Sequence, residues 1–321
     1  MKIKFCGAAQ HVTGSSHLLT LDDGFNILLD CGMFQGDEEK SRIKNQQWHI
    51  KPENIDCLIL SHAHIDHTGR VPKLVKDGFG GRIYATPATV SLCKIMLADS
   101  ALIQERDAEY FNNKIKTKKS KNKRGLVSPL YTLKDVKPAT DLMKSVEYNQ
   151  WKQIHPNVKI MFRDAGHILG SAGVILEITN DKQTLRLGFT GDIGRPDRPI
   201  LRDPQPLPSV DYLICESTYG DRQHEYTQEQ VNRFLEIIKR TCIENKGKLI
   251  IPAFSVGRTQ EIVYMLDRLE TVGLLPKIPV YVDSPLAVNA TEVYRKHPEC
   301  YDANLRQYLL EDPNPFGFNE L

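Results

Sequence analysis

Four side chains that can bind a metal ion occur within six consecutive residues: His62, His64, Asp66 and His67. They follow directly after the apolar run Cys57–Leu60, which we expect to be a buried strand. In an extended segment, side chains two residues apart point the same way, so His62 and His64 would face one point. Where the chain then turns into a helix, Asp66 and His67 would face a neighbouring point. The cluster predicts a metal site at the end of a strand, with ligands for two ions, and the fold must bring further ligands to that edge.

Two further ligand candidates lie in glycine-flanked turns. His167 lies in Ala165–Ser171, after the strand-like run Val158–Phe162, and Asp192 lies in Thr190–Gly194. Glycine allows the backbone to approach an ion closely. Imidazole and carboxylate ligands without a thiolate suit Zn²⁺, and Mn²⁺ or Fe are the alternatives. Because two such ions can activate a shared water near neutral pH, the set predicts a metal-dependent hydrolase.

Composition argues against a disordered, collagen-like or coiled-coil protein. The chain has 321 residues, 40% hydrophobic and 26% charged, as expected of a globular protein with two domains or one large one. Its net charge of +2 means that a polyanionic partner would have to be bound by local charge. The seven cysteines include no CxxC pair, which indicates buried thiols in a reducing compartment. Without a signal peptide or a run of about 20 apolar residues, we expect a cytoplasmic protein with no membrane partner.

Short apolar runs alternate with helical patterns, which predicts an α/β fold. The expected strands are Ile3–Cys6, His17–Leu21, Asn26–Asp30, Ile55–Leu60, Arg82–Tyr84, Val158–Phe162, Val174–Ile178, Leu185–Thr190 and Tyr212–Cys215. The first three suit an antiparallel meander, and a helix is expected at about Ala88–Asn113. Five prolines between Arg195 and Ser209 forbid regular structure, and a second domain begins near Thr218–Glu225. Within it we expect two strands and two helices: Leu249–Pro252, Pro279–Asp283, Arg258–Leu269 and Val288–His297.

The order of the candidate ligands resembles the signature of a known family. His62-x-His64-x-Asp66-His67, followed by His167 and Asp192, is similar to the motif set of the metallo-β-lactamase fold. The resemblance implies an αβ/βα sandwich with a dinuclear site at its edge. Asp30, in the segment Leu28–Gly32, matches the early aspartate of the family, which orients the site and is not a principal ligand. These motifs extend from residue 1 to about residue 195.

Three downstream segments resemble the β-CASP branch of that family, whose members process nucleic acids: Cys215–Gly220, Ile251–Arg258 and Asp283–Ala287. By this resemblance Glu216 occupies motif A, where glutamate is typical of members that act on RNA. The sequence resembles bacterial relatives of the endonuclease that cleaves messenger-RNA precursors before polyadenylation. The implied function is cleavage of RNA phosphodiester bonds, with single-stranded RNA as the expected partner, by a hydroxide that two zinc ions activate. Asp66, Glu216 and Asp30 would be the catalytic carboxylates, with Glu216 directing a proton to the leaving oxygen.

The resemblance also implies histidines that this sequence does not contain. The motif B and motif C histidines of the family follow the segment that Asp283–Ala287 resembles, and neither occurs before Leu321. We therefore expect a metallo-β-lactamase domain at residues 1–220 and an inserted β-CASP domain at residues 221–321 that is truncated on its C-terminal side. One metal site would have its full set of ligands: His62, His64, His167 and Asp192. The second would have fewer: Asp66, His67 and the bridging Asp192.

Two other functions stay open at this point: a hydrolase of small thioesters, lactones or lactams that uses the same metal site, and a catalytically inactive RNA-binding subunit. Arg258, at the start of an expected helix, is either a phosphate ligand or an ordinary surface residue. Ser284 either binds substrate or caps the next helix. Lys114–Arg124 contains seven basic residues, which form either a solvated loop or a phosphate-attracting surface. Oligomerisation is also left open.

Overall fold

The computed structural model describes residues 1–117, 126–180, 183–222, 228–310, 312 and 315–316. The chain divides into two units: unit 1 is Met1–Pro196 with Asp203–Glu216, and unit 2 is Asp197–Arg202 with Ser217–Leu321. The predicted domains 1–220 and 221–321 stay a prediction. Of the basic segment, the residues from Lys118 to Arg124 lie outside the described part of the chain. Among the helices that the structure describes, none has the length and apolar character needed to cross a bilayer.

The first sheet of unit 1 follows the order of the sequence. Its strands are β1 (Lys2–Gly7), β2 (Ser16–Thr20), β3 (Asn26–Leu29), β4 (Cys57–Ile59), β5 (Arg82–Ala85) and β6 (Met143–Ser145). β1, β2 and β3 form the predicted antiparallel meander, whereas β3 to β6 run parallel. Because parallel strands end at the same edge of a sheet, the segments that follow β3, β4 and β5 are neighbours there.

The second sheet of unit 1 has the order β11-β10-β9-β8-β7. Its strands are β7 (Lys152–His155), β8 (Val158–Asp164), β9 (Ala172–Thr179), β10 (Thr184–Phe189) and β11 (Tyr212–Ile214). Neighbours are antiparallel except β10 and β11, which are parallel. One buried cluster contains side chains of both sheets, among them Leu19, Ile27, Ile59, Ile160, Leu176 and Phe189. The two sheets therefore pack face to face around this core.

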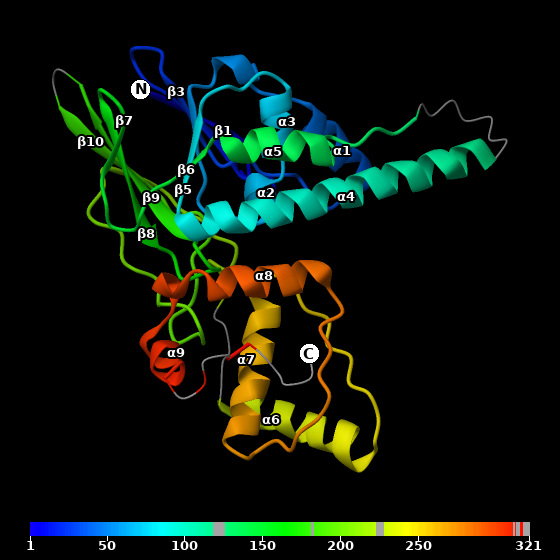
Figure 1. The fold of residues 1–321 in the computed structure, drawn as a ribbon. Helices are drawn as coiled ribbons and strands as arrows, with labels where there is room; N and C mark the ends of the chain where they lie inside the picture. The colour runs from blue at the N-terminus through cyan, green and yellow to red at the C-terminus, as the bar shows by residue number, and fades with distance from the viewer. Residues whose placement is uncertain (118–125, 181–182, 223–227, 311, 313–314, 317–321) are drawn as a thin grey trace. The chain divides into compact units, whose positions relative to one another are not determined.

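Helices form a third layer of unit 1. They are α1 (Glu38–Gln46), α2 (Ile65–Thr68), α3 (Val71–Lys76), α4 (Pro87–Thr117) and α5 (Leu133–Asp141). Figure 1 shows them on the side of the first sheet that faces away from the second. α4 confirms the helix predicted at about Ala88–Asn113. Unit 1 is therefore a layered α/β fold in which helices cover the outer face of the first of two stacked sheets.

Unit 2 contains the helices α6 (Gln228–Ile238), α7 (Arg258–Thr271), α8 (Pro285–Arg295) and α9 (Ala303–Tyr308). α7 and α8 confirm the two helices predicted there. α8 begins earlier than predicted because Ser284 caps it and Pro285 occupies its first turn, where proline is well tolerated. One buried apolar cluster of this unit is formed mainly by side chains of α6 and α7.

The two strands predicted in unit 2, Leu249–Pro252 and Pro279–Asp283, are wrong: the described residues form no strand there. Leu249 and Val280 pack against the apolar cluster of α6 and α7, while Ile250 and Tyr281 are exposed. Apolar residues in these runs therefore pack on helices without forming a sheet. A strand also needs a hydrogen-bonded neighbour, and within the described ranges neither segment has one.

Candidate metal centre

The histidine-rich segment forms the turn between β4 and α2. His62 is 1% exposed, and His64 occupies the N-cap position of α2. Asp66 and His67 lie in the single turn of α2. The predicted change from extended to helical backbone near Asp66 is therefore present, and it turns the second pair of side chains beside the first.

Two other loops bring His167 and Asp192 to the same edge. His167 lies between β8 and β9, and Asp192 follows β10. The Gly194 N–H, close after Asp192, donates to Ala165 O at 2.8 Å and so joins the two loops. A Cβ atom at position 194 would lie 1.7 Å from Gly166 O, so only glycine allows this approach.

Three buried hydroxyl side chains hold the His167 loop in place. The His167 N–H donates to Ser171 Oγ at 2.9 Å. At the start of α4, the hydroxyls of Thr86 and Thr89 donate to Gly170 O at 2.6 and 2.8 Å. Sequence reasoning misses these three residues, because hydroxyl side chains are common in turns and nothing local marks a contact between such distant segments.

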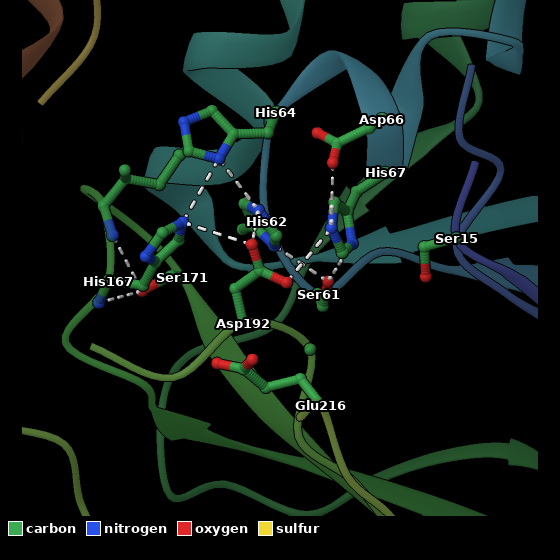
Figure 2. A network of polar contacts seen from close by, with 12 residues as sticks. Ser15, Ser61, His62, His64, Asp66, His67, His167, Ser171, Asp192 and Glu216 are labelled. Atoms are coloured by element: carbon green, nitrogen blue, oxygen red, sulfur yellow. Dashed lines mark hydrogen bonds and ion pairs between the residues drawn. The ribbon is translucent and has the colours of Figure 1, made fainter. Parts of the chain in front are cut away.

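Four ligand atoms converge at the edge of the sheets (Figure 2), and each lies within 4.8 Å of the other three. They belong to His62, His64, His167 and Asp192. His64 Nδ1 lies 3.1 Å from His62 Nε2 and 3.2 Å from His167 Nε2. Asp192 Oδ2 lies 3.4 Å from His167 Nε2. Three imidazole nitrogens and one carboxylate oxygen are ligands that zinc and similar divalent metals prefer, so this donor set fits a metal ion.

Asp66 and His67 lie on the other side of Asp192. His67 Nε2 is 3.2 Å from Asp192 Oδ1 and 3.8 Å from Asp66 Oδ2. Asp192 thus turns Oδ2 toward His167 and Oδ1 toward His67. A carboxylate that bridges two cations needs this arrangement, and all six predicted ligands are brought together.

Asp30 directly follows β3 and is fully buried behind the ligands. Its Oδ2 atom lies 2.7 Å from His67 Nδ1 and accepts hydrogen bonds from the hydroxyls of Ser15 and Ser61 at 3.0 and 2.9 Å. Its Oδ1 atom accepts from the Ser61 N–H at 2.8 Å. Asp30 therefore contacts a ligand from behind without joining the ligand group. Sequence reasoning misses both serines, although Ser61 directly precedes His62.

Two family models match this chain. The metallo-beta-lactamase superfamily domain matches residues 18–185, which is more than half of the chain. The chain belongs to the metallo-β-lactamase superfamily. The Beta-Casp domain matches residues 259–321. The predicted family and branch are thereby confirmed.

Curated relatives of this metallo-β-lactamase superfamily chain come from three domains of life. The Thermus thermophilus protein named ribonuclease TTHA0252 is 37% identical, over 98% of this chain and 66% of its own length. The transcription termination factor FttA of Methanosarcina mazei is 32% identical, over 98% of this chain and 47% of its own length. The cleavage and polyadenylation specificity factor 73 of Drosophila melanogaster is 30% identical, over 100% of this chain and 43% of its own length. The chain thus spans 43 to 66% of the length of these relatives.

The ligands of this metallo-β-lactamase site differ in charge before a cation binds. Burial and the neighbouring histidines lower the pKa of His62 well below its usual value and that of His64 to about 4, so both rings are neutral at pH 7. Burial raises the pKa of Asp192, but the hydrogen bond and charge of His67 outweigh it and bring the pKa to about 2. Burial lowers the pKa of His67, but the carboxylates of Asp30 and Asp192 outweigh it and raise the pKa well above its usual value. A metal ion at His67 would therefore have to displace a proton.

Glu216 lies beside the Asp192 loop. Its Oε1 atom accepts a hydrogen bond from the Ile193 N–H at 3.2 Å, and its own N–H donates to Thr190 Oγ1 at 3.1 Å. Figure 2 shows it next to Asp192, adjacent to the ligands and not among them. The structure thus places this motif A residue at the edge that carries the ligands.

The two predicted substrate contacts, Arg258 and Ser284, lie in unit 2. Arg258 is exposed and pairs with Glu261, with Nη1 and Oε2 3.1 Å apart. Ser284 Oγ accepts a hydrogen bond from the Ala287 N–H at 3.2 Å and lies 3.1 Å from Ser255 Oγ. Ser284 therefore caps α8, and substrate binding by Arg258 and Ser284 stays a prediction.

Proposed function

We propose that this chain is the catalytic part of a metal-dependent ribonuclease that cleaves phosphodiester bonds of single-stranded RNA. The observation that carries the proposal is the convergence of six ligand side chains. Asp192 lies among them with one carboxylate oxygen toward His167 and the other toward His67. Relatives named as a ribonuclease and as a cleavage factor support RNA as the substrate class. We further propose that the whole protein holds two Zn²⁺ ions, with Mn²⁺ or Fe as the alternative metals.

The ligands divide into two groups around Asp192. The first group would hold one ion: His62, His64, His167 and Asp192. The second would hold the other with a smaller set: Asp66, His67 and Asp192. Bound divalent cations would activate water for attack on phosphorus and neutralise the charge that develops on the phosphodiester oxygens.

Three carboxylates have separate tasks in this proposal. Asp30 orients His67 through the contact to Nδ1. Burial raises the pKa of Asp66, so this carboxyl group holds a proton more readily than a surface aspartate, and a cation beside it would favour the charged form. Glu216, held by the Ile193 N–H, would pass a proton to the leaving oxygen.

A cleavage assay with a chelator control separates the candidate functions. Labelled single-stranded RNA and a panel of thioesters, lactones and lactams are incubated with the full-length protein, before and after chelation and with Zn²⁺, Mn²⁺ or Fe²⁺ restored. We expect cleavage of RNA alone, loss of cleavage with chelator and recovery with metal. Turnover of a small molecule without RNA cleavage would establish the small-molecule hydrolase, and RNA binding without cleavage would establish the inactive subunit.

A single variant tests whether cleavage uses this site. Asp66→Ala should reduce RNA cleavage by about 100-fold or more, because removing even an outer partner of a metal site commonly costs 10- to 100-fold. Asp141→Ala is the matched control, since this exposed carboxylate of α5 pairs only with Lys137 among the contacts described. Unchanged cleavage by Asp66→Ala would reject catalysis through this site.

We also propose a cytoplasmic location. All seven cysteines are free, and five of them are buried, as expected of a protein in a reducing compartment. Cell fractionation followed by immunoblotting tests this location, and recovery in a membrane or extracellular fraction would contradict it.

A further inference from the structure

The hydroxyl group of Ser61 lies between a carboxylate and a ligand ring. Ser61 Oγ is 2.9 Å from Asp30 Oδ2 and 3.0 Å from His62 Nδ1. Ser61 is fully buried, so no solvent competes for these contacts. The proposed function gives this side chain no task.

Packing fixes the position of this hydroxyl. A Cβ atom added to Gly191 would lie 2.6 Å from Ser61 Cβ and 2.8 Å from Ser61 Oγ, so the backbone of the Asp192 loop lies directly against Ser61. The Ser61 N–H is bonded to Asp30 Oδ1 at 2.8 Å, which anchors the backbone as well. The hydroxyl therefore has little freedom to choose other partners.

The number of hydrogens on each group decides which atom donates in the hydrogen bonds among Asp30, Ser61 and His62. Asp30 Oδ2 faces His67 Nδ1 and the hydroxyls of Ser15 and Ser61, so this oxygen acts only as an acceptor. Ser61 has one hydroxyl hydrogen, and donating it to Asp30 leaves its oxygen as an acceptor toward His62. His62 must then carry its proton on Nδ1, which leaves the lone pair of Nε2 directed at the other ligands.

We propose that Ser61 is a positioning residue that holds His62 in the tautomer protonated on Nδ1 and connects it to Asp30. Asp30 then acts on His67 directly and on His62 through Ser61. One buried carboxylate thereby orients a ligand in each of the two groups. Hydrogen bonds of this kind fix the orientation of ligating rings and raise their basicity. The inference rests on the proposed metal site and is independent of RNA cleavage.

The ring tautomer can be measured before any metal is added. In the full-length protein with ¹⁵N-labelled histidine, long-range ¹H–¹⁵N correlations separate rings protonated on Nδ1 from rings protonated on Nε2, and a His62→Gln sample assigns the ring. We expect the Nδ1-protonated form of His62 in the wild type and a mixture of both forms in Ser61→Ala. Ser15→Ala removes a different hydroxyl from the same Asp30 oxygen and should leave His62 in the Nδ1-protonated form. An unchanged tautomer in Ser61→Ala would overturn the proposal.

Zinc affinity provides a second readout, measured by competition with a chromophoric chelator. Ser61→Ala should weaken zinc binding by about 10- to 100-fold, and Ser15→Ala by less. Ser61→Cys replaces the hydroxyl with a weaker donor and serves as the test variant where Ser61→Ala does not fold. Its zinc affinity should lie between that of the wild type and that of Ser61→Ala. Equal zinc affinity in wild type and Ser61→Cys, with an unchanged tautomer, would overturn the proposal. Neither readout uses RNA, so a failure to cleave RNA would reject the proposed function alone.

Discussion

Two polar clusters, one in each unit, differ in how their atoms are satisfied. In unit 1, ring nitrogens of His62, His64 and His167 face one another at 3.1 to 3.2 Å. In unit 2, the buried amide of Gln260 meets complementary groups at 2.8 to 3.2 Å, namely Ser255 O, Ala287 O, Thr291 Oγ1 and the Gly257 N–H. Rings whose Nδ1 and Nε2 atoms face one another can direct several lone pairs at one cation, whereas the amide of Gln260 already has both donors and acceptors from the protein around it. The contrast separates a ligand site from a structural clamp.

Gly194→Ala should have the largest effect on stability and on zinc affinity. It disturbs the unit 1 cluster without replacing any ligand. The new Cβ would meet Gly166 O and separate the loops that carry His167 and Asp192. We expect the free energy of unfolding to fall by about 1–3 kcal/mol and zinc affinity to fall by about 10- to 100-fold. Denaturant unfolding and chelator competition measure both. Gly80→Ala, where a Cβ has open space, is the matched control, and equal zinc affinity in the two variants would contradict the loop contact.

Gln260→Ala should break the unit 2 clamp and leave zinc content unchanged. The Gly257 N–H and the carbonyl of Ala287 would lose their amide partner inside the protein, at a cost of about 2 kcal/mol in the free energy of unfolding. Gln307→Ala, on the exposed side of α9, should change stability by less than about 0.5 kcal/mol. Denaturant unfolding and metal analysis of Gln260→Ala measure both quantities. A loss of zinc without a loss of stability would contradict the structural role of Gln260.

Asp267→Asn tests how the stability of unit 2 depends on pH. Burial raises the pKa of Asp267, the hydrogen bond from Tyr308 lowers it, and nearby Asp312 raises it, with a net value of about 6. The folded state therefore binds this proton more tightly than the unfolded chain, so the stabilisation is complete below about pH 4 and is lost as pH rises through about 6. The variant should be more stable than wild type at pH 7 by about 1 kcal/mol, with a flatter stability profile between pH 4 and 6. Asp221→Asn, exposed in the same unit, should leave the profile as it is; a wild-type profile without this decline would contradict the raised pKa.

Arg258→Gln should have the smallest effect, which we expect in the salt dependence of RNA binding. If this guanidinium contacts a phosphate, the slope of log affinity against log salt should decrease by about one unit. Lys137→Gln removes another surface cation, paired with Asp141, and should leave the slope unchanged. Filter binding over a range of salt concentrations measures both slopes, and equal slopes would show that Arg258 is an ordinary surface residue.

The ligands nearest in sequence could be predicted because local geometry suffices for them. His62, His64, Asp66 and His67 lie within one strand-to-helix turn, where the strand period and the first helical turn direct the side chains. For His167 and Asp192, flanking glycines are a weak signal, and the order of motifs in the family carried the assignment. The helices α4, α7 and α8 were predictable from their apolar periodicity.

Other features could not be predicted, for identifiable reasons. β6 has only three residues, and β7 (Lys152–His155) is largely polar, so neither gives an apolar run. The failed strand Pro279–Asp283 shows that a short apolar run does not distinguish packing on helices from pairing in a sheet. Ser15 and Thr86 reach the site from segments far from the ligands in sequence, and no pattern in one sequence marks such a contact.

The meeting of His64 and His167 has a consequence for folding. Their ring nitrogens are 3.2 Å apart although 103 residues separate them along the chain. One ring follows a strand of the first sheet and the other follows a strand of the second, so the complete coordination sphere exists only after both sheets have stacked. An ion that binds the finished protein and not the disordered chain shifts the folding equilibrium by mass action. The thermal resistance of the native state should therefore depend on the metal supply in its surroundings.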